Sequence, residues 1–315
     1  MGGLSVAVFP AHDKDARMEG FLDPRSDLVF RRIFGEHPDI LRDFLNAMLP
    51  LDSPIVSLEY LPIDQMPVLP VYKRGIVDVR CVDENGRQFI VEMQMQWTAA
   101  FLQRVLFNAS QAYVKQLEKG ETFELLQPVI ALSLLDDRFV RDSDEFYHHY
   151  RIVNVGMPER RIEGLEFVFV ELPKFRQARP GEARRVRWAW LRFLRDAADA
   201  GKAGHPSVEA FERETGINEA INEALRISRE SNFSPAERDA YDRFWDIVRT
   251  ERTLIQGKTK EAMEQGHAKG HAKGHAEGRA EGRAEGMAEG LELALKNMMA
   301  AGIAEAKAKG ILGIK

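Results

Sequence analysis

Residues 21–50 carry the hydrophobic spacing of two helices. Ser26 is placed to cap a first helix within SDLVFRRIFG, and Gly35 provides its stop. Pro38 suits the first position of a second helix that ends at Pro50. Its apolar residues recur at helical spacing and predict one buried face, formed by Ile40, Leu41, Phe44, Leu45 and Met48. We expect residues 1–20, before this pattern begins, to be disordered.

The next segments change to a strand pattern. Residues 55–61, IVSLEYL, predict a first strand. Residues 75–97 read GIVDVRCVDENGRQFIVEMQMQW, in which two strand-forming runs flank the turn signal Asn85-Gly86. This stretch predicts a β-hairpin.

Two registers of this hairpin can be compared by the faces that they create, because a slip of one residue moves every side chain to the opposite face. A two-residue turn at Asn85-Gly86 would mix apolar and polar residues on both faces. A three-residue loop, with Gly86 in the left-handed conformation, would make one face wholly apolar. We prefer the second register, which pairs Val77 with Met93, Val79 with Val91 and Cys81 with Phe89, and on the other face Ile76 with Gln94, Asp78 with Glu92 and Arg80 with Ile90.

The preferred register sets the carboxylates of Asp78 and Glu92 opposite each other. Their repulsion costs about 0.2–1 kcal/mol unless a cation or a proton lies between them. Hard oxygen ligands of this kind suit Mg²⁺ or Mn²⁺. The alternative is a solvated acid on each strand of an ordinary hairpin, and the pattern alone leaves the two interpretations equally open.

After Trp97 the spacing becomes helical and continues to a stop at Gly120. Arg104 lies off the apolar face near the start of this helix, where it is either solvated or turned toward the acidic end of the strands. The apolar face is predicted to consist of Phe101, Leu102, Val105, Leu106, Ala109, Ala112, Tyr113 and Leu117.

Three further strands are predicted over residues 128–135, 146–155 and 165–172. The first, PVIALSLL, is apolar throughout and is typical of a buried strand. His148 and His149 are adjacent in the second strand and so point to opposite faces, which argues against a metal site built from both. We interpret them as structural or solvent-facing.

Composition and charge narrow the class of protein. The 315 residues, of which 44% are hydrophobic, suffice for one sizeable α/β domain and a smaller second unit. A net charge of −5 gives no overall basic field, so a nucleic acid would have to be met by local patches. Cys81 is the single cysteine and excludes an internal disulfide. With neither a signal peptide nor a membrane span in the pattern, we expect a cytoplasmic protein without a membrane partner.

Residues 181–256 predict a helical region that follows the α/β domain. The capping box Ser234-Pro235-Ala236-Glu237 should begin a long helix. An earlier helix over residues 182–199 either contacts a DNA backbone or packs against the preceding domain with its arginines outward. The arginines expected to be exposed on it are Arg184, Arg185, Arg187, Arg192 and Arg195.

Residues 257–315 form a tail with a four-residue repeat, GHAK, GHAK, GHAE, GRAE, GRAE and GMAE, from Gly266 to Glu289. Each glycine costs about 1 kcal/mol of helix propensity relative to alanine, so a lone helix should be marginal here. Rows of small residues permit close approach between helices, which predicts a homo-oligomer formed through the C-terminal helices or the tail. Disorder is the alternative.

The histidines of the tail, His267, His271 and His275, lie at helical spacing. Arginine and methionine occupy the same position in later repeats. This substitution argues against a functional metal site.

The order of helix, three strands, helix and buried strand is the core order of the PD-(D/E)XK nucleases. Several blocks resemble one branch, the recombination-promoting nuclease (Rpn) family, also labelled transposases, over residues 21–175. These blocks are FLDPRSDLVFRRIFG, DFLNAML, VDV followed by VEMQ, QRVLFNASQAYVKQLEKGETFELLQPVIALSLL and VFVELPKF. The resemblance implies an α/β, restriction-endonuclease-like domain over residues 21–180, with a central mixed β-sheet flanked by helices and followed by a helical C-terminal region.

The resemblance also implies a metal-dependent DNA endonuclease associated with recombination or mobile elements, with DNA as partner and Mg²⁺ or Mn²⁺ as cofactor. Asp78 would be the motif aspartate, and Glu92 with Gln94 the E-x-Q form of the usual E-x-K pair. Asp27 is a possible further carboxylate, and the main-chain carbonyl of Met93 could complete the metal coordination.

Gln94 departs from the commonest pattern of the superfamily. A glutamine can orient a water molecule but lacks the positive charge of a lysine, so we expect a lower rate and the same assignment. Arg104, Lys73 or Lys115 could meet flanking phosphates. Two function classes stay open: a Mg²⁺-dependent endonuclease, and a catalytically inactive relative that binds DNA or self-assembles.

Overall fold

The computed structural model describes residues 20–65, 75–98, 100–118, 120–176 and 185–314. The described residues fall into two units, one ending at Val248 and one beginning at Arg249. The predicted disorder of residues 1–19, and the sites expected at Lys73 and Arg184, lie outside the described residues. None of the described helices combines the length and the apolar character needed to cross a membrane.

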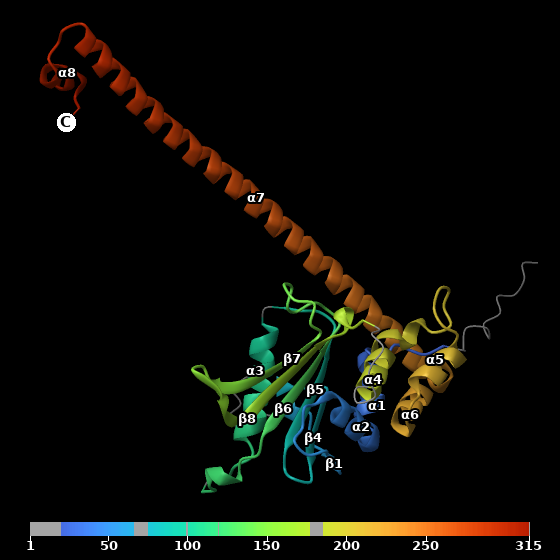
Figure 1. The fold of residues 1–315 in the computed structure, drawn as a ribbon. Helices are drawn as coiled ribbons and strands as arrows, with labels where there is room; N and C mark the ends of the chain where they lie inside the picture. The colour runs from blue at the N-terminus through green and yellow to red at the C-terminus, as the bar shows by residue number, and fades with distance from the viewer. Residues whose placement is uncertain (1–19, 66–74, 99, 119, 177–184, 315) are drawn as a thin grey trace, which may run out of the picture. The chain divides into compact units, whose positions relative to one another are not determined.

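A mixed six-stranded sheet organises the described part of the first unit, in the order β1-β4-β5-β6-β8-β7 (Figure 1). Strands β1, β4 and β5 pair antiparallel, β5, β6 and β8 pair parallel, and β7 pairs antiparallel with β8. The mixed sheet predicted from the sequence is confirmed. Its strands are β1 (Leu58–Tyr60), β4 (Val79–Asp83), β5 (Gln88–Gln94), β6 (Val129–Leu135), β7 (Tyr147–Asn154) and β8 (Met157–Glu171). A separate pair consists of β2 (Asp64–Gln65) and β3 (Gly75–Ile76).

Helices cover both faces of the sheet (Figure 1). One face packs against α3 (Phe101–Val114). The other face packs against a group of helices that includes α1 (Asp27–Phe34), α2 (Pro38–Met48), α4 (Arg185–Asp196), α5 (Val208–Thr215) and α6 (Glu219–Ser228). Short 3₁₀ turns occur at Phe123–Leu125, Leu172–Lys174, Ala197–Asp199 and Glu230–Asn232.

The helix starts predicted from the sequence are confirmed. The hydroxyl of Ser26 caps α1 by accepting a hydrogen bond from the amide of Val29, and Pro38 is the first residue of α2. Ser234 and Glu237 form the expected capping box at the start of α7 (Pro235–Ala300).

The central hairpin adopts the preferred register. Val79 lies opposite Val91 and Cys81 lies opposite Phe89, and Gly86 has φ +82°. The cluster that contains Val79, Cys81, Phe89 and Val91 packs against the α1–α2 side of the core. The alternation of apolar residues and the conformational freedom of one glycine therefore suffice to set this register.

The predicted ladder is wrong beyond Val79. Asp78 does not pair with Glu92, because β4 begins at Val79, and Ile76 does not pair with Gln94, because β3 pairs with β2 instead. Val77 does not share the apolar face of Val79 but is buried on the other side of the sheet, with Ile90 and α3. The chain bends at Asp78, and this bend turns the preceding residues out of the ladder.

Replacing Gly86 with alanine is expected to destabilise the protein by more than the strain of a left-handed alanine alone, which is about 1–2 kcal/mol. A Cβ at this position would lie 3.0 Å from Cγ of Gln127. Gly204→Ala is the matched control, since Gly204 also has positive φ but no atom within 4 Å of the added Cβ. Urea unfolding of both variants measures the difference in the free energy of unfolding. Equal losses in the two variants would show that Gln127 moves aside without a cost in stability.

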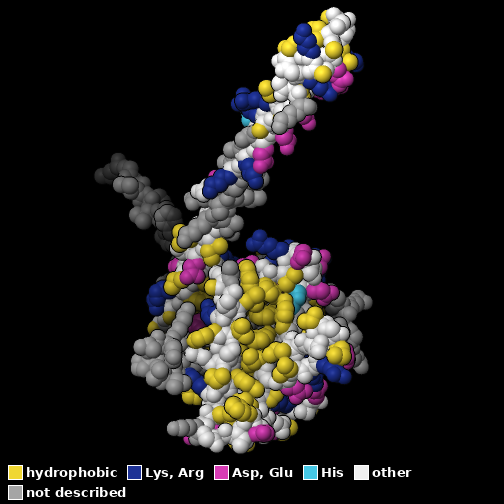
Figure 2. Space-filling model, turned by 90° about the vertical axis from the view of Figure 1, so that its left-hand side faces the viewer, with side chains coloured by type: hydrophobic (Ala, Val, Ile, Leu, Met, Phe, Trp, Pro, Cys, Tyr) yellow, Lys and Arg dark blue, Asp and Glu magenta, His cyan; other side chains and the backbone are white. Residues whose placement is uncertain are grey.

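The buried face of α3 differs from the predicted one. Leu102 and Leu106 are 37% and 50% exposed, whereas Asn108 is buried against the sheet. The small side chains of Ala109 and Ala112 let this face approach the strands closely. Figure 2 shows hydrophobic side chains gathered on the surface of the first unit that faces the viewer.

Helix α4 uses its arginines for internal contacts, so the prediction that they all point outward is wrong. Arg192 is buried and pairs with Glu214 at 2.6 Å. Nε of Arg187 donates a hydrogen bond to the carbonyl of Ala47 at 2.7 Å. Arg187 and Arg192 therefore contact neighbouring elements, whereas Arg185 is exposed as predicted.

The second unit, from Arg249, consists of the rest of α7 and of α8 (Glu305–Leu312). Helix α7 includes the whole four-residue repeat, so the structure has the helical alternative for the tail. The rings of His271 and His275 stack 6.3 Å apart, and the side chain of His267 lies outside the described ones.

Candidate active site

The carboxyl ends of the parallel strands meet at one end of the sheet, and the predicted site residues lie there. β5 ends at Gln94, β6 at Leu135 and β8 at Glu171. β4 runs antiparallel to β5, so the start of β4 lies at the same end. Helix α3 joins the parallel strands β5 and β6, which places its N-terminus there as well.

Asp78 lies one residue before β4, where the chain leaves the ladder. Its Oδ2 accepts a hydrogen bond from the main-chain amide of Met93 at 2.8 Å. In a continued ladder Val77 would lie opposite Met93 and its carbonyl would supply this acceptor. The carboxylate thus takes the place of a strand carbonyl and is attached to the strand that carries Glu92.

Glu92 is 6% exposed and faces α3. Its Oε1 accepts a hydrogen bond of 3.0 Å from Nδ2 of Asn108, and its Oε2 lies 3.7 Å from Nη2 of Arg104. The sequence reasoning missed Asn108. The available signal was its position three residues after Val105, on the face that α3 buries.

Gln94 is held at both ends of its amide. Nη2 of Arg104 donates a hydrogen bond to Oε1 of Gln94, and Nε2 of Gln94 donates to the carbonyl of Gln96 at 2.7 Å. Gln96 is itself buried and donates to the carbonyl of Val248 at 3.1 Å. Of the two alternatives for Arg104, the structure has the one turned toward the acidic strand end.

Burial is the main reason that the pKa values of Asp78 and Glu92 are both raised above their ordinary values. The Met93 amide and the charges of Arg31 and Arg104 oppose the shift of the Asp78 pKa, and the charge of Asp27 adds to it. For Glu92, Arg104 and Asn108 oppose the shift, while the charge of Asp78 adds to it. The charge of Asp78 therefore acts on Glu92, so the two acids are within electrostatic reach although Asp78 lies outside the ladder.

The comparison with protein families agrees with this geometry. A family model described as PD-(D/E)XK nuclease family transposase matches residues 24–256, well over half of the chain. The chain belongs to this PD-(D/E)XK family. Neither curated proteins nor solved structures gave a match. Membership confirms the resemblance noted in the sequence, and the mixed sheet with flanking helices is the expected PD-(D/E)XK fold. It supports a nuclease-type function linked to transposition, in a superfamily that generally uses divalent metal ions.

Asp27 lies within electrostatic reach of Asp78, but its ion pair is with a residue of its own helix. It is the first residue of α1 and forms an ion pair of 2.9 Å with Arg31. Its charge acts on the pKa of Asp78, so the two carboxylates are within electrostatic reach. Its assignment as a further site carboxylate stays a prediction.

Of the cations expected to meet phosphates, Arg104 lies at this end of the sheet and Lys115 does not. Lys115 caps the C-terminus of α3, about 20 Å along the helix from its start. Burial chiefly lowers the pKa of Lys115, and the positive charge of Arg80 lowers it further. Lys115 is therefore remote from the two acids, and its contact with a flanking phosphate stays a prediction.

The sequence reasoning also missed the contacts that hold the FLDPRSD block beside β6. Nε and Nη2 of Arg25 bind both oxygens of Asp23, at 2.9 and 2.6 Å, and Nη1 reaches Asp136 at the end of β6. The amide of Asp23 in turn donates to the hydroxyl of Tyr241. The FLDPRSD block was recognised by resemblance. Its contacts with Asp136 and Tyr241 could not be predicted, because these partners are distant in the sequence.

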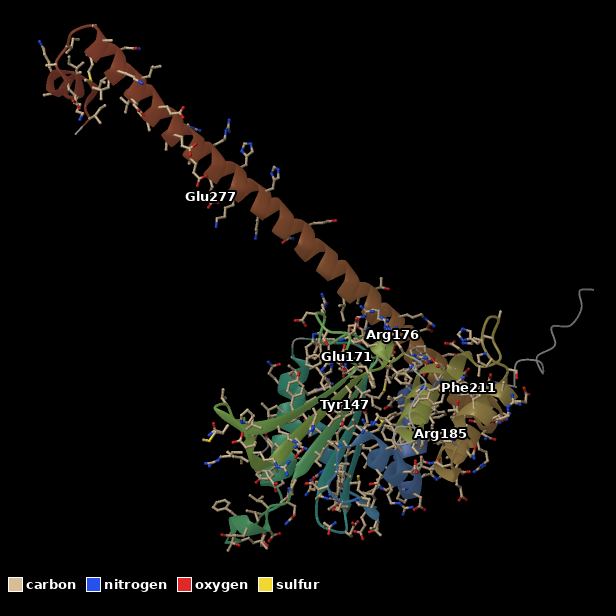
Figure 3. The ribbon with its side chains drawn as sticks, in the orientation of Figure 1. Tyr147, Glu171, Arg176, Arg185, Phe211 and Glu277 are labelled. Carbon is tan, nitrogen blue, oxygen red and sulfur yellow. The ribbon has the colours of Figure 1, made fainter. Side chains whose placement is uncertain are left out.

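Glu171, at the carboxyl end of β8, is a fully buried carboxylate that was not predicted (Figure 3). It accepts hydrogen bonds from the amides of Phe139 and Val140, from His148 at 2.7 Å and from Lys174 at 2.8 Å. Burial opposes its ionisation, but these donors outweigh burial and hold its pKa below the ordinary value. An acid that ends an otherwise apolar run, VFVEL, was the available signal.

The side chains at this end of the sheet can be compared with the ligands that a divalent metal ion requires. Among the described residues, no three or more His, Cys, Asp or Glu side chains form a group that could hold a metal. Asp78 and Glu92 provide two neighbouring carboxylates, and Mg²⁺ is commonly bound by one or two carboxylates together with substrate phosphates. Their shared repulsion is relieved by a cation. The chemistry of these donors therefore fits Mg²⁺ or Mn²⁺.

Proposed function

We propose that this PD-(D/E)XK family protein is a Mg²⁺- or Mn²⁺-dependent DNA endonuclease that acts in recombination or in the movement of mobile elements. One observation carries the proposal. The partly buried Asp78 and the buried Glu92 are held by hydrogen bonds at one end of the sheet, within electrostatic reach of each other. The amide of Gln94 lies at the same end and is held by hydrogen bonds of its own. Burying two neighbouring acids costs free energy that the Met93 amide, Asn108 and Arg104 offset only in part, since both pKa values stay raised, and a bound cation would offset more of it.

The residues have separate roles in this proposal. Asp78 and Glu92, with the main-chain carbonyl of Met93, would hold the metal ion. When bound, such an ion polarises the scissile phosphate and lowers the pKa of a water molecule. Gln94 orients the attacking water. The oxygen of this water adds to phosphorus as the water loses a proton, and the bond from phosphorus to one bridging oxygen breaks. The leaving oxygen takes up a proton, so the products are a phosphate monoester end and a hydroxyl end.

Purified protein incubated with supercoiled plasmid tests this function. Nicked or linear products should form with Mg²⁺ or Mn²⁺ and disappear with EDTA. A protein that binds the plasmid in a gel-shift assay but leaves it supercoiled with either ion would instead be the catalytically inactive relative, which binds DNA or self-assembles.

We also infer that the tail mediates self-association. Its support is the helical form of the repeat, which aligns rows of glycine and alanine along α7 where another helix could approach closely. A chain that ends at residue 256 is expected to show a lower oligomeric state than the full chain in light scattering, with the circular dichroism of the sheet retained. An unchanged oligomeric state, after scaling for the shorter chain, would contradict self-association through the tail.

A further inference from the structure

We propose that Arg104 supplies the positive charge that Gln94 cannot, and that its guanidinium contacts the scissile phosphate as negative charge develops there. The inference rests on the proposed endonuclease function. It assigns to a residue of α3 the role that a lysine on the strand usually fulfils in this superfamily. Gln94 then becomes the partner that holds the cation in place as well as a water-orienting group.

The contacts of Arg104 place its charge at the required position. Its Nη2 donates to Oε1 of Gln94 and lies 3.7 Å from Oε2 of Glu92. A lysine at position 94 would extend from the strand into this same neighbourhood. The cation therefore approaches the carboxylates from the helix instead of from the strand.

Other observations show that this placement is specific. A positive charge near the start of a helix is opposed by the helix dipole, so Arg104 is held there by its acidic and amide partners and not by the helix itself. The guanidinium also lies 5.3 Å from the ring centroid of Phe101, which restricts its motion.

The guanidinium retains capacity for a phosphate. Its side chain is half exposed, and its hydrogen bonds to the described residues engage Nη2 alone. The remaining N–H groups of a planar guanidinium match the oxygens of a phosphate. A fixed cation of this kind stabilises developing charge more than it strengthens ground-state binding.

A double-variant cycle tests the inference. Arg104→Gln is expected to lower kcat for Mg²⁺-dependent nicking about 10²-fold, with little change in KM. Gln94→Lys in the same chain should restore most of the loss, because it moves the cation from the helix to the strand. Gln94→Lys alone should bring no increase, because two cations would then crowd one position.

Two measurements separate this role from indirect effects. Calorimetry with Mn²⁺ and no DNA should show that Arg104→Gln binds the ion at least as tightly as the wild type, since a nearby cation has been removed. Arg226→Gln is the matched control for net charge, because Arg226 lies in α6, is exposed and pairs with Glu223. This control should nick DNA like the wild type.

The outcomes distinguish the inference from the function on which it rests. A wild type that never nicks DNA overturns both. An active wild type with an equally active Arg104→Gln overturns the role of Arg104 alone. Loss of Mn²⁺ binding in Arg104→Gln, or no rescue by Gln94→Lys, would show that Arg104 merely supports the carboxylates.

Discussion

Replacing Asp78 with asparagine, or Glu92 with glutamine, is expected to lower metal-dependent nicking of plasmid DNA by about 10³-fold or more. Each substitution keeps the size of the side chain but removes one of the two charges that a divalent ion requires. Thermal stability in metal-free buffer should stay the same or rise in both variants, because the repulsion between the two acids is lost. Gln94→Ala should weaken nicking less.

Glu163→Gln is the matched control for this experiment. Glu163 is an exposed acid of β8 that pairs with Arg161, so its loss changes the net charge equally without touching the site. Rates are measured on supercoiled plasmid at saturating Mg²⁺, with thermal unfolding followed in parallel. Nicking by Asp78→Asn at the wild-type rate would show that the activity arises elsewhere, and the binding-only function would then be preferred.

Replacing Glu171 with glutamine is expected to lower the free energy of unfolding by about 3–5 kcal/mol, because it leaves the buried ammonium of Lys174 without its countercharge. Lys174 is 4% exposed, and its other contacts are the carbonyls of Val140 and Glu145. Urea unfolding at neutral pH measures the loss. The double variant Glu171→Gln/Lys174→Met should recover much of it, because neither charge is then buried.

The effect should depend on pH in a definite direction. The pKa of Glu171 is lower in the folded protein than in the unfolded chain, so the unfolded chain binds more protons in acid. The stabilisation is therefore present above the ordinary carboxyl pKa and is lost as pH falls toward the lowered value. The difference between wild type and Glu171→Gln should shrink over this range.

Glu166→Gln serves as the control on the same strand. Glu166 is partly exposed and pairs with His149 and Arg151, so its loss should cost about 1 kcal/mol or less. Equal losses of the free energy of unfolding in the Glu166 and Glu171 variants would show that burial of the Glu171 network does not increase its contribution to stability.

How much of the site could be predicted varies with the range of the interactions. The register from Val79 to the loop followed from the period-two pattern and Gly86, which act within one hairpin, whereas Asp78 lies beyond that ladder and reaches β5 through the amide of Met93. The partners of Glu92 could not be assigned from that hairpin, because Asn108 and Arg104 come from a helix whose rotation was unknown. Leu102 and Leu106 fit a helical apolar face by spacing, yet the sheet accepts the flatter face with Ala109 and Ala112.

The sequence by itself determined α1, α2 and α3, the six strands of the main sheet, the caps of α1 and α7, and the hairpin register from Val79 to the loop, because each depends on neighbours within a few residues. Only the tertiary structure decided that Val77 turns to the α3 side, that Arg192 is buried, and that Glu171 binds Lys174 and His148. These outcomes depend on which elements distant in the sequence pack together, and on which charged side chains then become buried and need a partner. Local spacing carries no record of either.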